Sequence, residues 1–165
     1  MVTQQTRQHI WYRLLDIARY VRYYDSLATR YRRYWFWINT VLALSGTGVL
    51  ATFLIPIHDI VPHIMGAVIA VLTVWNLSLN PGETVAALKF INRDIGMLEH
   101  EYRLLWESIE SGQIEDAEAL RMSDAILKRV HVLASGLTIS TDNQLNQQCA
   151  EEVNMAEKER YYHAA

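Results

Sequence analysis

Two long apolar runs, separated by a short hinge, dominate the pattern of hydrophobic and polar positions along the chain. The first covers residues 34–55 and the second residues 60–79, and His63 is the only Asp, Glu, Lys, Arg or His in either run. A helix rises about 1.5 Å per residue, so about 20 apolar residues cross the roughly 30 Å hydrocarbon core of a bilayer. A helix buried in a soluble core usually keeps a polar face, and neither run has one. The pattern therefore predicts a helical hairpin that crosses a membrane twice, with two buried helices of a soluble core as the alternative.

The segments on both sides of this hairpin carry apolar residues at alternating steps of three and four, which is typical of a helix with a coiled-coil-like seam. The first seam consists of Ile10, Leu14, Ile17, Val21, Tyr24, Ala28 and Tyr31. The second seam consists of Leu88, Ile91, Ile95, Leu98, Tyr102, Leu105 and Ile109. The two seams have no other obvious surface to cover, so they pair with each other within one chain or between chains. A homo-oligomer is the economical interpretation.

Helices are accordingly predicted over residues 4–33, 82–111, 115–136 and 144–161, in addition to the two apolar runs. The first of them has no Pro or Gly to interrupt it and can continue directly into the first run. In the helix over 115–136 we expect the inward-facing residues to be Leu120, Leu127, Val130 and Ala134.

The predicted fold class is an all-α membrane protein, a two-helix transmembrane hairpin with long cytosolic helical extensions, assembled as a homo-oligomer. Its parts are a basic amphipathic helix (1–33) that continues into the membrane, the hairpin (34–79, with spans 34–55 and 60–79), a cytosolic helical domain (80–137), and a polar C-terminal helix or tail (138–165).

Charge is distributed unevenly along the chain, although the net charge is only −3. Residues 1–34 contain seven Arg and two acidic residues, whereas residues 80–165 contain eight Lys or Arg and fifteen acidic residues. The hinge between the runs contains no Lys or Arg, so the positive-inside rule places both termini in the cytoplasm. The single cysteine, Cys149, excludes an intrachain disulfide.

No motif of a known catalytic site is present, so we expect neither an enzyme nor a cofactor nor a resident metal. Phosphate-binding glycine loops, paired cysteines, zinc-binding helix motifs and nucleophile elbows are all missing. His58, Asp59 and His63 lie together in and beside the hinge. They are interpreted as polar loop residues rather than as a loose metal site.

Small and polar residues follow one face of the second run: Gly66, Ala70, Thr73, Asn76 and Asn80. In lipid such a stripe allows helices to approach closely, so a packing face is the simpler interpretation. The functional interpretation is a pore in an oligomer, lined by Ala70, Thr73 and Asn76. A stripe in the first run, formed by Ser45, Gly48 and Thr52, is the second choice.

A basic stripe precedes the first run, because Arg19, Arg22, Arg30 and Arg33 fall within about 80° of one another on a helical wheel. The simpler interpretation is a topology signal with some pairing to the acidic C-terminal helices. The sharper one is a site for an anionic ligand, a nucleotide or a short single-stranded oligonucleotide. Arg binds phosphate in a bidentate manner, and the neighbouring Tyr20 and Tyr23 could stack on bases.

Three features of the chain resemble the SLATT family of small bacterial two-transmembrane proteins. They are the Tyr- and Arg-rich stretch over 23–33, the hairpin that follows, and the stretch HEYRLLWE over 100–107. The resemblance covers about residues 20–110. It implies a pore-forming effector of an anti-phage system in the bacterial inner membrane, acting with a nucleotide-synthesising or nucleotide-sensing partner such as a nucleotidyltransferase.

The expected function is therefore a membrane effector that forms a ligand-gated ion channel controlled by a nucleotide or oligonucleotide signal, with a tetramer as the working stoichiometry. The alternative is a non-conducting membrane anchor that recruits a partner enzyme through its cytosolic helices.

Overall fold

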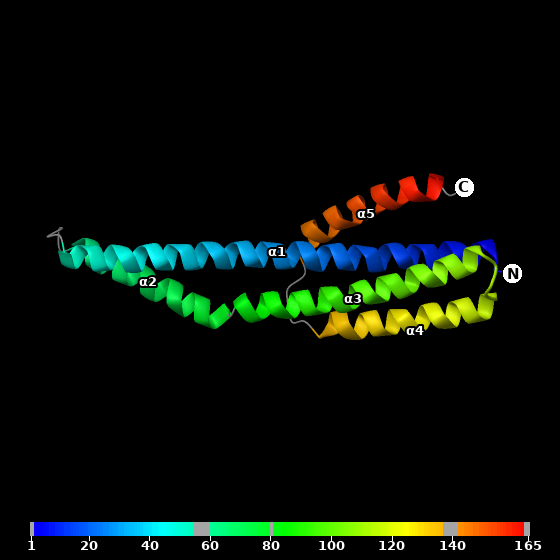
Figure 1. Ribbon diagram of the computed structural model, residues 1–165, viewed down its shortest axis with the longest axis horizontal. Coiled ribbons are helices and arrows are strands. Elements are labelled where there is room, and N and C mark those ends of the chain that lie inside the picture. Colours follow the sequence, from blue (N-terminus) through cyan, green and yellow to red (C-terminus); the bar gives the residue numbers. More distant parts are fainter. Residues whose placement is uncertain (1, 55–59, 80, 137–141, 164–165) are drawn as a thin grey trace. The chain divides into compact units, whose positions relative to one another are not determined.

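The computed structural model contains five helices among the residues that it describes (Figure 1): α1 (Gln4–Leu54), α2 (Ile60–Leu79), α3 (Pro81–Glu110), α4 (Asp116–Ser135) and α5 (Asn143–His163). The backbone is described for residues 2–54, 60–79, 81–136 and 142–163, and side chains for 2–44, 63–64, 66–76, 82–136 and 142–157. The all-helical prediction is confirmed for these residues. α2 to α5 begin and end within two residues of the predicted limits, and α1 continues without a break through the described part of the first apolar run.

The chain divides into two compact units. Unit 1 combines residues 1–26 with residues 88–165, and unit 2 consists of residues 27–87. The beginning and the end of the sequence therefore belong to one unit, and residues 27–87, which separate them in the sequence, form the other. α1 and α3 each contribute residues to both units.

The core of unit 1 is built from the two predicted seams. All seven residues of the second seam are buried, and Ile10, Leu14 and Ile17 of the first seam are at most 1% exposed. α1 and α3 meet through Trp11 and Trp106, whose ring centroids lie 5.0 Å apart. The seam residues of α1 in unit 1 thus pack against the seam of α3 within one chain, which was one of the two arrangements left open by the sequence.

α4 packs in a different register from the predicted one. Val130 is buried as expected, but the other predicted inward residues of this helix are only half-buried. The buried residues of α4 are Ala119, Ser123, Ile126 and Val130. The reason is a hydroxyl pair: Tyr102 and Ser123 place their oxygen atoms 2.6 Å apart inside the bundle. Small residues at 119 and 123 allow α4 to approach α3, and the hydrogen bond offsets the cost of burying both hydroxyls.

A polar network extends from this hydroxyl pair to α1. Arg13 Nη1 donates to Ser123 Oγ at 3.0 Å and also to a carboxylate oxygen of Asp124. Burial raises the pKa of Tyr102 above its ordinary value, although its hydrogen bond with Ser123 acts in the opposite direction. The network links three helices, α1, α3 and α4, through side chains that all have partners.

The turn between α3 and α4 depends on Gly112, which has a φ of +71°. The N–H of Gly112 donates to the carbonyl of Ile109 at 3.1 Å, and that of Gln113 to the carbonyl of Ser108 at 3.0 Å. These are the two hydrogen bonds of a Schellman cap, in which glycine avoids the strain of a left-handed backbone. α3 ends at Glu110, within one residue of the predicted limit at 111.

α5 completes unit 1 through a buried stripe at four-residue spacing, Leu145, Cys149 and Val153, each at most 4% exposed. Its first turn is capped by Asp142, whose Oδ1 accepts from the N–H of Leu145 at 3.0 Å. The N–H of Asp142 donates to the hydroxyl of Tyr23 on α1 at 3.1 Å. The polar C-terminal segment is therefore a docked helix over its described residues.

A partly buried ion cluster joins α5 to α3. Arg103 Nη2 lies 2.7 Å from Glu99 Oε1 and 2.8 Å from Glu157 Oε1. The Glu157 side chain is only 7% exposed. Burial of Arg103 acts to lower its pKa, but the hydrogen bonds and charges of Glu157 and Glu99 outweigh it, and the pKa of the guanidinium is raised overall.

The structure contradicts the predicted transmembrane hairpin. Within its described residues, no helix is both long and apolar enough to cross a membrane. The membrane fold class, the topology and the inner-membrane location are corrected accordingly; residues 55–59, which contain the hinge, lie outside the described part.

Candidate functional site

The predicted basic stripe is divided between the two units, with Arg19 and Arg22 in unit 1 and Arg30 and Arg33 in unit 2. Arg19 Nη2 lies 3.3 Å from Asp16 Oδ1, one helical turn away. The guanidinium of Arg19 also lies over the ring of Tyr20, 5.5 Å from its centroid, an arrangement that favours a cation–π contact. Its Nε is buried without a hydrogen-bond partner. Arg19 and Tyr20 are thus engaged with each other and with their own helix.

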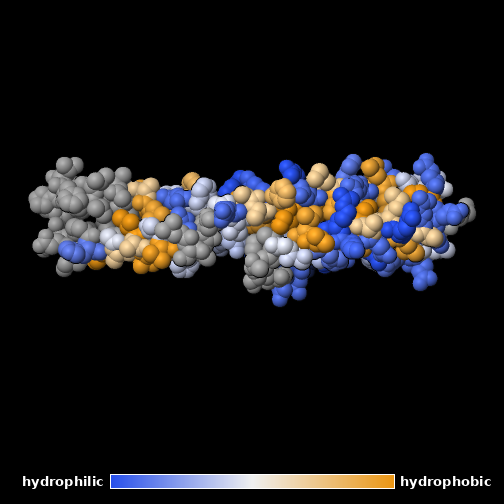
Figure 2. Space-filling model, turned by 90° about the horizontal axis from the view of Figure 1, so that it is seen from below, coloured by the Kyte–Doolittle hydropathy of each residue, from blue (hydrophilic) through white to orange (hydrophobic). Residues whose placement is uncertain are grey.

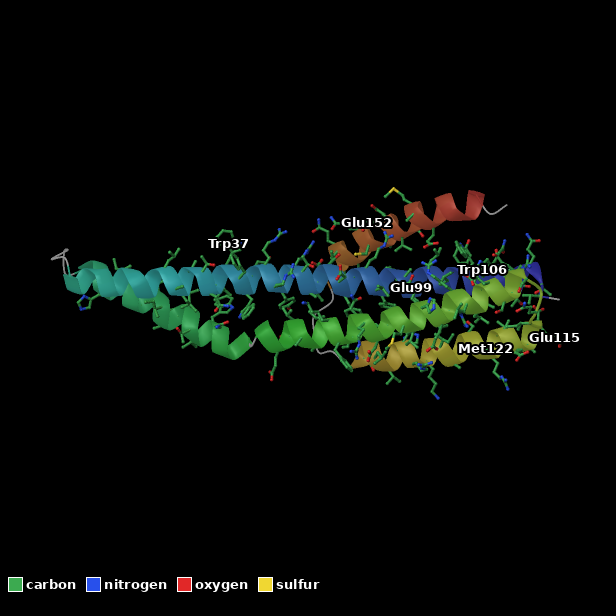
Figure 3. All side chains as sticks on the ribbon, viewed as in Figure 1. Trp37, Glu99, Trp106, Glu115, Met122 and Glu152 are labelled. Carbon is green, nitrogen blue, oxygen red and sulfur yellow. The ribbon has the colours of Figure 1, made fainter. Side chains whose placement is uncertain are left out.

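Arg22 and Tyr23 connect α1 to α5. Arg22 Nη1 lies 3.8 Å from Glu152 Oε2, and Glu152, labelled in Figure 3, lies near the middle of α5. Tyr23 is 7% exposed, and its hydroxyl holds the first turn of α5 through Asp142. Its ring packs edge-on against that of Tyr24, with the centroids 5.5 Å apart. Tyr23 is therefore a structural residue in this arrangement and has no open face for a base, whereas the pairing of Arg22 agrees with the simpler interpretation of the stripe.

Unit 2 contains a groove along α1 that the sequence did not predict. It has a volume of about 720 Å³, and its described lining residues are Thr29, Arg32, Arg33, Trp35, Phe36, Asn39, Thr40 and Ala43. Arg33 belongs to the predicted stripe, whereas Arg32 does not. The signal that could have revealed the groove is the helical spacing of residues 29, 33, 36, 40 and 43, which places one arginine, an aromatic ring and two threonine hydroxyls along one face.

The predicted pore-lining residues lie on α2 in unit 2. Ala70 and Thr73 are exposed, and Asn76 is half-buried with its Oδ1 in a position that water does not reach and without a hydrogen-bond partner. A pore would require the membrane hairpin that the structure contradicts. The second-choice stripe, Ser45, Gly48 and Thr52, lies outside the described side chains, as do His58 and Asp59 of the hinge.

Large apolar side chains are exposed on both helices of unit 2. Trp37 of α1 is 58% exposed, and Val71 of α2 is 63% exposed. Figure 2 shows apolar side chains, in orange, gathered on the described part of this unit at the left of the view. Contiguous apolar surface of this kind is typical of an interaction surface.

A second groove, of about 710 Å³, lies between α3 and α4 in unit 1. Its lining is mainly apolar and includes Met97, Ala125 and Val132. An ion pair at its edge joins Arg129 Nη1 to Glu101 Oε2 at 2.7 Å. No cluster of three or more potential metal ligands occurs among the described residues. The polar contacts of unit 1 described above hold helices together rather than converge on an open reaction site.

No protein-family model matches the chain, and neither the curated proteins nor the solved structures contain a match. The resemblance to the SLATT family, and the nucleotide signal that it implies, stay predictions.

Proposed function

We propose that this chain is a non-catalytic assembly protein. In this proposal, unit 2 joins copies of the chain to one another, and each copy contributes one unit 1 bundle for the recruitment of a partner protein. The observation that carries the proposal is a pair of exposed apolar seams in unit 2. The ligand-gated pore is not retained, because it depends on the contradicted membrane hairpin, whereas the homo-oligomer and the recruitment of a partner do not depend on it.

The first exposed seam lies on α1 and consists of Tyr34, Trp37, Val41 and Leu44. The steps between these residues are three, four and three, and their exposed fractions are 67%, 58%, 39% and 66%. This is the spacing that places side chains along one stripe of a helix for knobs-into-holes packing.

The second exposed seam lies on α2 and consists of Ile64, Val68, Val71 and Trp75. The steps are four, three and four, and the exposed fractions are 59%, 42%, 63% and 57%. Seams of the same spacing are buried against each other in unit 1, which favours helical partners of the same kind for the seams of unit 2.

A second copy of the chain supplies such a partner. Neither seam contains a charged side chain, so a highly charged partner surface would lose hydration without forming ion pairs. A helix whose apolar residues follow the same alternating steps of three and four provides holes into which these side chains can pack. Two copies of unit 2 present such helices to each other. Their association would remove exposed apolar surface from water at a gain of roughly 25 cal/mol per Å².

Sedimentation velocity of the purified full-length chain over a range of concentrations tests this proposal. Val71→Glu places a charge in the α2 seam and should shift the chain to monomers. Val132→Glu is the matched control, because Val132 is 65% exposed on α4 of unit 1 and Val71 is 63% exposed. It should leave the oligomer unchanged.

A wild-type chain that stays monomeric at every concentration would contradict the proposal, as would equal effects of the two substitutions. Flotation with lipid vesicles is measured in parallel. A monomeric chain whose binding to vesicles is abolished by Val71→Glu would show that lipid, rather than a second copy, covers the seams.

A further inference from the structure

We propose that the groove along α1 in unit 2, at residues 29–43, binds one molecule of an anionic amphiphile, with a phosphate or carboxylate head on an apolar body. Arg32 and Arg33 are the groups for the head, and Trp35, Phe36 and the following turns of the groove contact the body.

The first argument is uncompensated positive charge. The sequence contains no acidic residue between Asp25 and Asp59. Arg32 and Arg33 are exposed and make no ion pair with any described residue. By contrast, Arg22 and Arg103 of unit 1 each have a carboxylate partner. Two adjacent guanidinium groups without acidic neighbours attract an anion, and the planar fork of Arg matches phosphate and carboxylate oxygens.

The second argument is the order of groups along the groove. Thr29 and the two arginines lie at one end, Trp35 and Phe36 follow about one turn after the arginines, and Ala43 lies at the far end. The distance along the axis from Arg33 to Ala43 is about 15 Å, at 1.5 Å per residue. Trp35 and Phe36 are 42% and 61% exposed, so their rings have free surface for an apolar body. Charge at one end and apolar surface beyond it is the complement of a molecule with a single anionic head.

The third argument is that the polar groups in the middle of the groove are uncharged. The hydroxyl of Thr40 donates to the carbonyl of Phe36 at 2.9 Å, which satisfies it within its own helix. Asn39 is half-buried beside it. The groove thus concentrates its charge at the arginine end, and its volume of about 720 Å³ is suitable for one small molecule.

This site is independent of the proposed assembly of unit 2. Residues 34, 37, 41 and 44 of the α1 seam each follow a groove residue by one position, which turns the side chain by about 100° around the helix. The seam and the groove are therefore neighbouring but different faces of α1, and either proposal can fail without the other.

Isothermal titration calorimetry with the full-length chain tests the site. The probe is lysophosphatidate below its critical micelle concentration, which carries a phosphate head and one acyl chain. Glycerol 3-phosphate supplies the head alone, and the monoacylglycerol of the same acyl chain supplies the body alone. We expect lysophosphatidate to bind at least about tenfold more tightly than either of them, since both ends of the groove are used.

The variant Arg32→Gln with Arg33→Gln should weaken lysophosphatidate binding by about tenfold or more, because it removes the charge-assisted hydrogen bonds to the head. Arg121→Gln, at an exposed position on α4, is the control for general charge and should have no effect. Sedimentation of each variant shows whether its assembly is unchanged.

Four results would overturn the proposal. The first is that lysophosphatidate does not bind, and the second is that glycerol 3-phosphate binds as tightly as lysophosphatidate. The third is that the monoacylglycerol binds as tightly as lysophosphatidate. The fourth is that Arg121→Gln weakens binding as much as the double substitution of Arg32 and Arg33. The second result would indicate a plain phosphate site, and the third a purely apolar surface.

Discussion

Replacing Arg103 with methionine should destabilise unit 1 much more than replacing Arg129 with methionine. The two arginines form ion pairs of the same length, with closest N–O distances of 2.7 Å to Glu99 and to Glu101. They differ in burial. Side-chain exposure is 29% for Arg103 and 7% for its second partner, Glu157, but 60% for Arg129 and 45% for Glu101. The comparison therefore contrasts a partly buried cluster of one arginine and two carboxylates with a single exposed ion pair.

The expected loss of unfolding free energy depends on which carboxylates lose their partner in each variant. Without Arg103, two carboxylates of Glu99 and Glu157 lose their shared partner inside the bundle, and breaking a buried pair typically costs about 3–5 kcal/mol. Arg103 is partly exposed, so water compensates part of this loss, and we expect about 2–3 kcal/mol of unfolding free energy. For the exposed pair of Arg129 we expect at most about 1 kcal/mol.

Reactivity of the Cys149 thiol reports the effect locally, because Cys149 is 2% exposed on the face of α5 that docks in unit 1. If opening of α5 precedes labelling, 2–3 kcal/mol corresponds to about a 30- to 160-fold faster reaction of Arg103→Met with a thiol reagent. Urea unfolding followed by circular dichroism gives the global value. Adding Glu157→Met to Arg103→Met should recover part of the loss, since it removes a buried unpaired carboxylate. Equal costs for Arg103→Met and Arg129→Met would refute the reasoning.

Three further predictions concern the bundle. Ile95 has a fully buried side chain, so Ile95→Ala should lower the free energy of unfolding in urea by about 2–5 kcal/mol. Met97→Ala, at a side chain that is 54% exposed on the same helix, should change it by no more than about 0.5 kcal/mol, and equal losses would place Ile95 outside the core. Asp142→Ala should lower the free energy of unfolding by about 0.5–2 kcal/mol and accelerate labelling of Cys149. Asp142→Asn keeps the capping oxygen and should have a smaller effect on both. Identical behaviour of the two variants would argue against capping by Asp142. Burial raises the pKa of Tyr102 above its ordinary value of 10.0, so the folded state holds this proton to higher pH than the unfolded state. The contribution of Tyr102 to the free energy of unfolding should therefore be constant well below pH 10 and fall as the pH rises from there. Tyr102→Phe should make that fall shallower by at most about 1.4 kcal/mol per pH unit, and a fall of the same steepness in both chains would contradict the shift.

The spacing of apolar residues at alternating steps of three and four predicted the flanking helices and much of the buried core. It identified every buried residue of the α3 seam, because one face of a helix must be apolar wherever it packs. In α4 it predicted Val130 correctly but missed Ala119, Ser123 and Ile126. Hydropathy cannot identify a hydroxyl as a core residue when its partner, Tyr102, lies on another helix.

The arginine stripe illustrates the same limit for the candidate site. The helical wheel placed Arg19, Arg22, Arg30 and Arg33 near one another, but it carried no information about the acidic groups that approach from elsewhere. Glu152 pairs with Arg22 from a helix far along the sequence, and Asp142 uses the hydroxyl of Tyr23. Arg32, which is not part of the predicted stripe, lines the groove together with Arg33.

The sequence by itself determined the helical elements, their limits and the seams, because these depend on local periodicity, helix-terminating residues and the absence of breakers. Tertiary structure decided which seams found a partner within the chain and which polar side chains were already engaged. The seams of unit 1 are buried against one another, while seams of the same spacing in unit 2 are exposed. The physical reason is that periodicity specifies which face of a helix is apolar, whereas the surface that covers this face is set by contacts between residues distant in the chain.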